Sequence, residues 1–213
     1  MAEMIPDRLP SGASAGEKRV FEALQRLPDN CIVYYEPVVG NRYPDFVVIM
    51  PEIGLLIVEA KGWYPAHIES GDLSQVKITN RGRTEGQRHP IRQARDYMLE
   101  LMDAAKASSG SAALLRSGGN HTGQLICPFG HLVVLNNMRR EQLDSLGLTQ
   151  LFPASRVMGA VVQVSRENLA LAVLWGAIGA SALITLFSPK MTAAGAGGGG
   201  LSGIMANLVQ TAF

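Results

Sequence analysis

Two short and almost uninterrupted apolar segments, residues 45–50 and 55–61, constrain the fold of this chain more than any other feature. Both are rich in Val, Ile, Leu and Phe, and a turn at residues 51–54 separates them. Runs of this length and composition are typical of strands that are buried on both faces of a sheet. They predict two neighbouring strands at the centre of a covered sheet.

Helical patterns flank these strands. Apolar side chains at helical spacing predict a helix over residues 15–27, with Ser14 as its N-cap. A second helix is predicted to begin at Pro90 and to extend to about residue 107. Further strand patterns occur at residues 31–35, 67–69, 75–79, 124–127 and 132–135, the last two around a turn at 128–130. The predicted fold class is α/β, a mixed central β-sheet flanked by helices, with a C-terminal hydrophobic helical tail.

Charged residues divide the chain into two unequal parts. Of 19 basic and 18 acidic residues, only Glu167 and Lys190 lie beyond Arg166. We therefore expect a flexible N-terminus (1–12), one main domain (13–138), a connector (139–166) and an apolar Gly/Ala-rich tail (167–213).

The tail allows three interpretations. Residues 168–189 carry no charge, and a helix of about 20 apolar residues is long enough to cross a bilayer. A transmembrane segment at 168–188 is the first interpretation; a helix packed on the domain and an accidental ending after a disrupted reading frame are the others. The first residues show no signal-peptide pattern, so the main body is expected in the cytoplasm, at the inner face of the membrane if the tail spans it.

The composition excludes some classes of site and restricts others. Cys31 and Cys127 are far apart and lack CxxC spacing, which argues against a disulfide framework and a zinc knuckle. The net charge is only +1, so binding of nucleic acid requires a local basic patch. Arginines gather near the second helix, and their alternatives are a solvated surface or an edge that contacts phosphate. They are Arg81, Arg83, Arg88, Arg92 and Arg95, of which Arg88, Arg92 and Arg95 are the candidate nucleic-acid contacts.

The central strands also carry the candidate chemistry. Side chains alternate along a strand, so Glu59 and Lys61 point to the same face. If Met50 pairs with Leu55 across the turn, Asp45 lies opposite Ala60, and a one-residue bulge would bring it onto that face. Two carboxylates and the Ala60 backbone carbonyl would then form an oxygen-rich site for Mg²⁺, with an ammonium beside it. A structural ion pair is the alternative interpretation.

The ordered set of these residues resembles the nuclease-related domain (NERD) family of the PD-(D/E)xK nuclease superfamily over about residues 13–138. The matching residues are Gly16 and Glu17, Arg42 to Phe46, Val58 to Lys61 with Trp63, and Gln93 with Tyr97. The resemblance implies a restriction-endonuclease-like core, with Asp45 and Glu59 as metal ligands and Lys61 as the catalytic lysine. It also implies that Glu17 joins the acidic cluster and that Gln93 supports the site.

These observations predict a nuclease-type domain that hydrolyses DNA phosphodiester bonds with Mg²⁺ or Mn²⁺ and no small-molecule cofactor. RNA as the substrate and the oligomeric state are left open. Trp63 and Tyr64 either pack at the rim of the core or stack on bases. The main alternative is a non-catalytic nucleic-acid-binding or interaction module on the same scaffold. A membrane-associated structural protein, with the tail as its functional part, is a third possibility.

Overall fold

The apolar segments form the centre of a six-stranded sheet in the computed structural model, which describes residues 1–51, 53–108, 113–120, 122–153 and 156–159. β3 (Phe46–Met50) and β4 (Gly54–Lys61) pair as an antiparallel hairpin. Every residue of β3 and the first six residues of β4 are buried. Burial of a Val, Leu or Ile side chain contributes about 1.5–3 kcal/mol, so this hairpin carries much of the hydrophobic stabilisation.

Two strands extend the sheet on each side of the hairpin. β2 (Ile32–Tyr35) pairs antiparallel with β3, and β1 (Glu3–Ile5) lies parallel to β2 at one edge. On the other side, β8 (Phe129–Leu135) and β9 (Val157–Gly159) continue the sheet in parallel with β4. The predicted mixed sheet is confirmed, with the strand order β1-β2-β3-β4-β8-β9.

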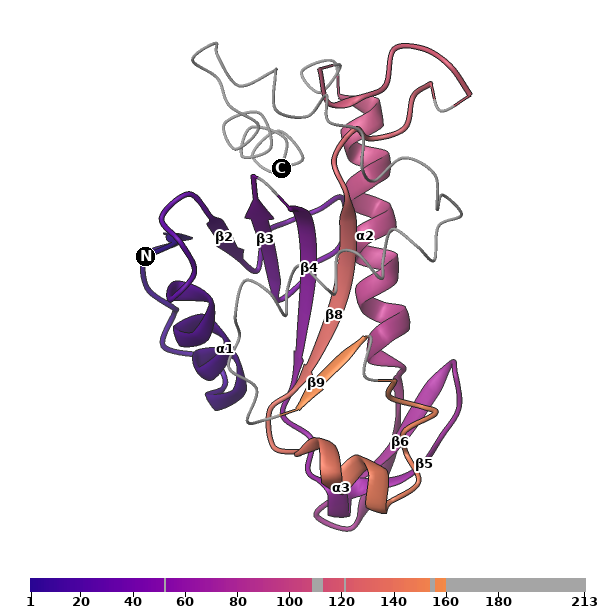
Figure 1. Cartoon of the computed structure of the whole chain (residues 1–213). Coiled ribbons are helices and arrows are strands. Elements are labelled where there is room, and N and C mark those ends of the chain that lie inside the picture. Colours follow the sequence, from indigo (N-terminus) through magenta and orange to yellow (C-terminus); the bar gives the residue numbers. More distant parts are fainter. Residues whose placement is uncertain (52, 109–112, 121, 154–155, 160–213) are drawn as a thin grey trace.

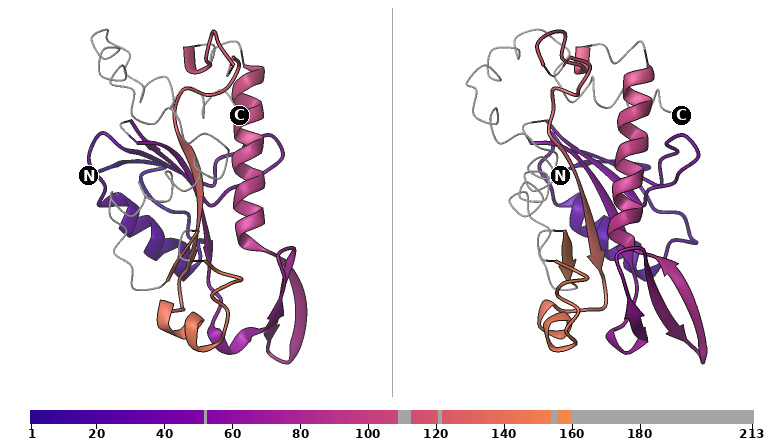
Figure 2. Two further views of the ribbon diagram at one scale, coloured as in Figure 1. Left: turned by 45° about the vertical axis from the view of Figure 1, so that its right-hand side comes forward. Right: turned by 90° about the vertical axis from the view of Figure 1, so that its right-hand side faces the viewer.

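Two helices cover opposite faces of this sheet (Figures 1 and 2). Alternate side chains of β4 separate into two cores: Leu56 and Val58 pack in the cluster under α1 (Ala15–Gln25). Leu55 and Ile57 pack in the cluster under α2 (Pro90–Ala107). Both helices were predicted, and Ser14 caps α1 by accepting a hydrogen bond from the backbone N–H of Glu17.

A smaller antiparallel sheet lies beyond the end of the main sheet at which β4 and β8 finish (Figure 1). It consists of β5 (Ile68–Gly71), β6 (Gln75–Asn80) and β7 (Arg83–Arg88), and the short 3-10 helix η1 (Pro65–His67) connects it to β4. Both α1 and α2 also begin at this end of the molecule. The carboxyl ends of β4 and β8, two helix N-termini and the small sheet therefore surround one region.

Several short elements differ from the sequence-based expectation. The N-terminus, expected to be flexible, contains β1, and the expected connector contains α3 (Arg140–Ser145) and β9. The turn expected at 128–130 is wrong, because β8 already begins at Phe129. At 124–127, expected as a strand, the structure has only an isolated bridge between Leu115 and Leu125.

The register of the central hairpin also differs from the prediction by one residue. Met50 pairs with Gly54, not with Leu55, and Phe46 consequently pairs with Val58. Gly54 can take this position because its backbone φ is +136°, and because it has no side chain where the Pro128 carbonyl approaches. The backbone N–H of Leu55 donates to that same carbonyl at 2.9 Å.

The predicted transmembrane segment at 168–188 lies outside the described residues and stays a prediction. Among the residues that the structure describes, no helix combines the length and the apolar character needed to cross a membrane.

Replacement of Gly54 by alanine should destabilise the fold more than an ordinary glycine replacement in a turn. An added Cβ would lie 2.1 Å from the Pro128 carbonyl oxygen, a clash with backbone that only a shift of a strand relieves. We expect Gly54→Ala to cost about 3 kcal/mol or more of unfolding free energy, measured by urea denaturation. Gly82→Ala is the matched control, because Gly82 also has a positive φ (+75°) but open space around it; its cost should be about 1 kcal/mol. Equal costs would contradict the packing argument.

Candidate active site

The observed register brings Asp45 to Glu59 without a bulge. Continuing the pairing of Phe46 with Val58 by one residue places Asp45 opposite Glu59, not opposite Ala60, so the predicted one-residue bulge is wrong. Asp45 lies just before β3, where the strand has not yet begun, and its backbone carbonyl accepts a hydrogen bond from the Glu36 N–H at 2.9 Å. Asp45 is therefore held between β2 and β4.

The Asp45 carboxylate accepts the hydrogen bond that a backbone carbonyl of β3 would accept if that strand began earlier. Its Oδ2 accepts a hydrogen bond from the backbone N–H of Ala60 at 2.7 Å. The carbonyl of the next residue, Lys61, bonds to the Asn136 N–H after β8. Because neighbouring residues of a strand direct their backbone groups to opposite sides, the Ala60 carbonyl points to the side of β3, past its end. This carbonyl thus opens toward Asp45, away from β8.

Glu59 and Lys61 lie on one face of β4 and form a buried ion pair. The Nζ of Lys61 is 2.7 Å from Oε1 of Glu59, whose side chain is only 1% exposed, whereas that of Lys61 is 19% exposed. The second oxygen, Oε2 of Glu59, is buried and accepts no hydrogen bond of normal geometry from any described residue, although the Asp45 backbone N–H lies near this carboxylate and favours its charged form. An unpartnered carboxylate oxygen in a buried position is costly unless a cation or a proton satisfies it.

Glu17 approaches the carboxylates from α1. Its Oε2 accepts hydrogen bonds from the Ser14 backbone N–H at 2.8 Å and from the Tyr35 hydroxyl at 3.1 Å. Glu17 therefore completes a capping box at the start of α1, and its charge also acts on Asp45 and Glu59. The sequence did not point to Tyr35 as a partner, because its place beside Glu17 depends on how α1 packs on β2.

The electrostatics of this cluster favour protonated carboxyl groups in the absence of a cation. Burial raises the pKa of Asp45 to about 7, and the negative charges of Glu59 and Glu17 act in the same direction. Burial also raises the pKa of Glu59, although the nearby Lys61 ammonium opposes this shift. A bound divalent cation would reverse the balance by favouring the ionised forms.

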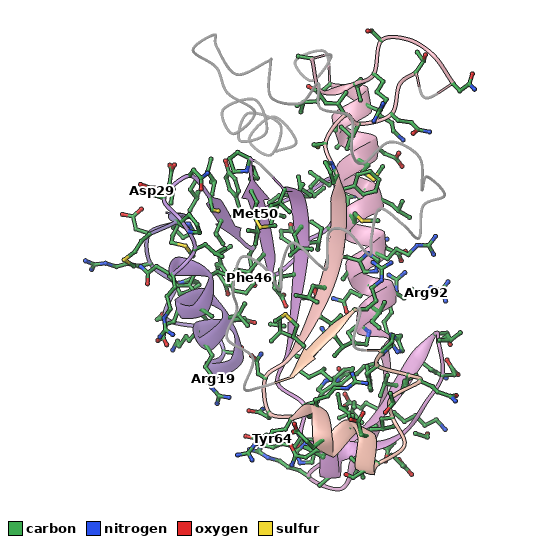
Figure 3. All side chains as sticks on the ribbon, viewed as in Figure 1. Arg19, Asp29, Phe46, Met50, Tyr64 and Arg92 are labelled. Atoms are coloured by element: carbon green, nitrogen blue, oxygen red, sulfur yellow. The ribbon has the colours of Figure 1, made fainter. Side chains whose placement is uncertain are left out.

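The other predicted site residues are less directly connected to this cluster. The side-chain amide of Gln93 donates to the Tyr97 hydroxyl at 2.8 Å, and no hydrogen bond joins it to the carboxylates among the described residues. Arg88 forms an ion pair with Asp96. Arg92 and Arg95 are exposed on α2, and Figure 3 shows Arg92 directed away from the sheet.

A polar group that sequence reasoning missed lies where β8 ends. Asn136 is 4% exposed, and its Nδ2 atom is buried without a hydrogen-bond partner in the described part of the chain. The Arg19 guanidinium donates to the Asn136 carbonyl at 3.1 Å and to Oδ1 of Asn137 at 3.0 Å. Only the parallel pairing of β4 with β8 brings these residues near Lys61, so no local sequence pattern indicated them.

The donors present fit a small oxygen-preferring cation. Glu59 Oε2, the Asp45 carboxylate and the Ala60 carbonyl are hard oxygen ligands, which Mg²⁺ and Mn²⁺ accept together with water. No group of three or more His, Cys, Asp or Glu side chains is arranged to hold a metal among the described residues. The candidate site therefore rests on two carboxylates and a backbone carbonyl.

The comparison with known families agrees with this geometry. Residues 12–136 match the family described as the nuclease-related domain. Neither the search of curated proteins nor that of solved structures returned a match to the chain.

The raised pKa of Asp45 predicts a pH-dependent stability that a divalent cation reverses. The folded protein holds a proton on Asp45 that the unfolded chain, with an ordinary value of 3.8, releases. Protonation of Asp45 thus contributes to the free energy of unfolding below about pH 4, and this contribution is lost as pH rises toward 7. The loss is on the order of a few kcal/mol. Mg²⁺ should stabilise the protein increasingly over the same range, because it binds the ionised form.

Thermal unfolding between pH 4 and 8, with Mg²⁺ or with chelator, measures this effect. Asp45→Asn should flatten the pH dependence and reduce the stabilisation by Mg²⁺. Asp29→Asn, which changes an exposed carboxyl in the loop beyond the C-terminal end of α1, should behave like the parent. Identical profiles for the parent and Asp45→Asn would contradict the electrostatic account.

Proposed function

Since the chain belongs to the nuclease-related domain family, we propose that it is a metal-dependent nuclease that hydrolyses phosphodiester bonds in DNA. Asp45 and Glu59 are the proposed metal ligands, with the Ala60 carbonyl, and Lys61 is the proposed catalytic residue. Glu17 and Gln93 are proposed to support the site, and Arg88, Arg92 and Arg95 to contact the phosphate backbone.

The burial of Oε2 of Glu59, which accepts no hydrogen bond of normal geometry from the described residues, is the observation that carries this proposal. A purely structural ion pair would use its buried carboxylate fully, since an unsatisfied oxygen costs stability. Here Lys61 engages only Oε1, and the Asp45 carboxylate lies just before β3, where it accepts from the Ala60 N–H. These oxygens are the proposed ligands of one cation at this end of the sheet.

In the proposed reaction, groups of the protein orient the reacting molecules and stabilise the charge that develops. The Ala60 N–H donates to one oxygen of Asp45 and so restricts rotation of this carboxylate. The Lys61 ammonium, partly exposed beside Glu59, is placed to orient the attacking water and to stabilise negative charge that develops on the phosphate. A divalent cation held here would polarise the phosphodiester and lower the pKa of a bound water.

A non-catalytic binding module is the second candidate, and one observation favours it. Lys61 is already in contact with Glu59 at 2.7 Å, which is the geometry of a stable ion pair. In a module without activity this pair would keep the sheet end folded. The two functions differ in whether loss of the Lys61 ammonium affects chemistry or only stability.

Lys61→Ala should separate cleavage from binding. The change removes the ammonium but keeps both carboxylates, so Mg²⁺ and DNA should still bind with little change in affinity. Cleavage should fall by about 10²–10³-fold, as for other contacts made mainly in the transition state. Cleavage of labelled linear and circular DNA, with Mg²⁺ and with chelator, provides the measurement.

Lys106→Ala is the matched control, because it removes an exposed lysine in the last turn of α2, remote from the site. It should cleave like the parent protein. Parent-level cleavage by Lys61→Ala would overturn the assigned mechanism. If the parent, Lys61→Ala and Lys106→Ala all bind DNA and none of them cleaves it, the non-catalytic module is supported.

The arginines of α2 should contribute affinity through charge. Both Arg92 and Arg95 are exposed in the first two turns of α2, which begins at the site end of the molecule. The double change to alanine should weaken duplex binding and reduce the slope of log affinity against log salt by about 2, because fewer counterions are released. The double change to lysine retains the charge and should preserve the slope, and both are measured by titration at several salt concentrations. An unchanged slope in the alanine variant would exclude these arginines as phosphate contacts.

A further inference from the structure

A groove adjoins the candidate active site and is separate from its carboxylates. It encloses about 590 Å³ between the segment that follows β4 and one face of the β6–β7 hairpin. This volume is within the range of about 300–1,000 Å³ that is typical of sites for small organic groups. Its first lining residue is Gly62, the immediate neighbour of Lys61 in the chain. The groove therefore begins one residue beyond Lys61, the proposed catalytic residue.

One wall of the groove is aromatic. Trp63 is 7% exposed, and its indole Nε1–H donates to Oε1 of Gln87 at 3.1 Å, which fixes this wall to β7. Tyr64 is 51% exposed, and its ring contacts His67 edge-on at a centroid distance of 5.3 Å. The Tyr64 ring is thus held by a neighbour but remains accessible, at the same end of the molecule as the small sheet (Figure 3).

Another part of the lining, from the β6–β7 hairpin, carries positive charge. Alternation along β7 places Arg83, Glu85 and Gln87 on one face, and all three line the groove. Arg81 joins them from the turn between β6 and β7, where its φ is +49°. Both arginines are exposed, and among the described residues neither forms a salt bridge. Glu85 is the one carboxylate among the lining residues, so the groove retains positive charge.

We propose that this groove binds a single-stranded segment of the DNA next to the bond that is cleaved, with a base stacked on Tyr64 and phosphates at Arg81 and Arg83. An accessible aromatic ring that shares a groove with guanidinium groups is the combination by which proteins hold unpaired nucleotides. Paired bases expose only their edges, so a duplex cannot use the Tyr64 ring in this way. The substrate class is therefore DNA with an unpaired strand adjoining the cleavage position, such as an overhang or flap. This refinement rests on the proposed nuclease function, but binding in the groove can be tested without any cleavage.

The test measures binding by the full chain in chelator, so that catalysis does not contribute. The sequence contains only two tryptophans, Trp63 and Trp175, and a Trp175→Phe background makes the fluorescence report on Trp63. Titration with an oligothymidylate should quench this fluorescence in a saturable manner, and a hairpin duplex of the same length should not. Tyr64→Ala should weaken binding of the oligothymidylate about tenfold, which is within the range for loss of one stacked base.

Two conservative variants make the test specific. Tyr64→Phe keeps the ring and should bind like the parent, and Arg83→Lys should retain most of the affinity that Arg83→Ala loses. Tyr64 is exposed, so its replacement should leave the melting temperature unchanged. Equal affinity of Tyr64→Ala and the parent, no quenching of Trp63 at saturation, or equally effective competition by an oligoglutamate would each overturn the proposal.

The outcomes also distinguish failure of the groove from failure of the nuclease. If Tyr64→Ala loses binding while no protein cleaves DNA, the groove is supported and the nuclease function is overturned. If the parent cleaves duplex and single-stranded DNA equally well and Tyr64→Ala binds normally, the nuclease is supported and the groove proposal is overturned.

Discussion

The burial of Glu59 at the end of β4 is the constraint on which the candidate site depends. A carboxylate with 1% exposure is stable only when its charge is compensated, and one of its oxygens already contacts the Lys61 ammonium. The neighbouring Asp45 is held by the Ala60 backbone, so two acidic groups are kept close although they repel each other. The sheet holds these two carboxylates in place, because Asp45 directly precedes β3 and Glu59 lies in β4, and the apolar residues of β3 and of β4 up to Val58 are buried.

The central hairpin links the hydrophobic core to the chemistry. Leu55 and Ile57 pack against one core, Leu56 and Val58 against the other, and the next residue along the strand is Glu59. A shift of one residue in the pairing would exchange the faces of all these side chains. At the first residue of β4, only a residue without a side chain fits against the Pro128 carbonyl, which fixes the start of β4 beside β8. The positions of the polar groups are thus determined by apolar packing at the other end of the same strand.

Sequence patterns predicted the elements that have strong apolar periodicity and missed those that do not. The central strands, α1 and α2 were predicted because their side chains repeat at strand or helical spacing. β7 was missed because its six residues contain no large apolar side chain; it is held by backbone pairing with β6. The face shared by Glu59 and Lys61 followed from alternation. Three features could not be predicted without knowing where β3 begins. They are the pairing register, the hydrogen bond from Ala60 to Asp45, and the burial of Oε2 of Glu59.

The parallel pairing of β4 with β8 has a consequence for the order of folding. The β3–β4 hairpin is local and such hairpins form within about 1–10 μs, whereas β8 can pair only after the chain between residues 61 and 129 has crossed over. Contacts between distant segments form late, because closing a long loop costs entropy before any contact is gained. During synthesis we therefore expect the hairpin to bring Asp45 and Glu59 together while Glu59 is still in contact with water. Their burial waits until residues 129–135 have left the ribosome, so a nascent chain carries the acidic pair before it has the enclosed environment that shifts the pair's proton affinity.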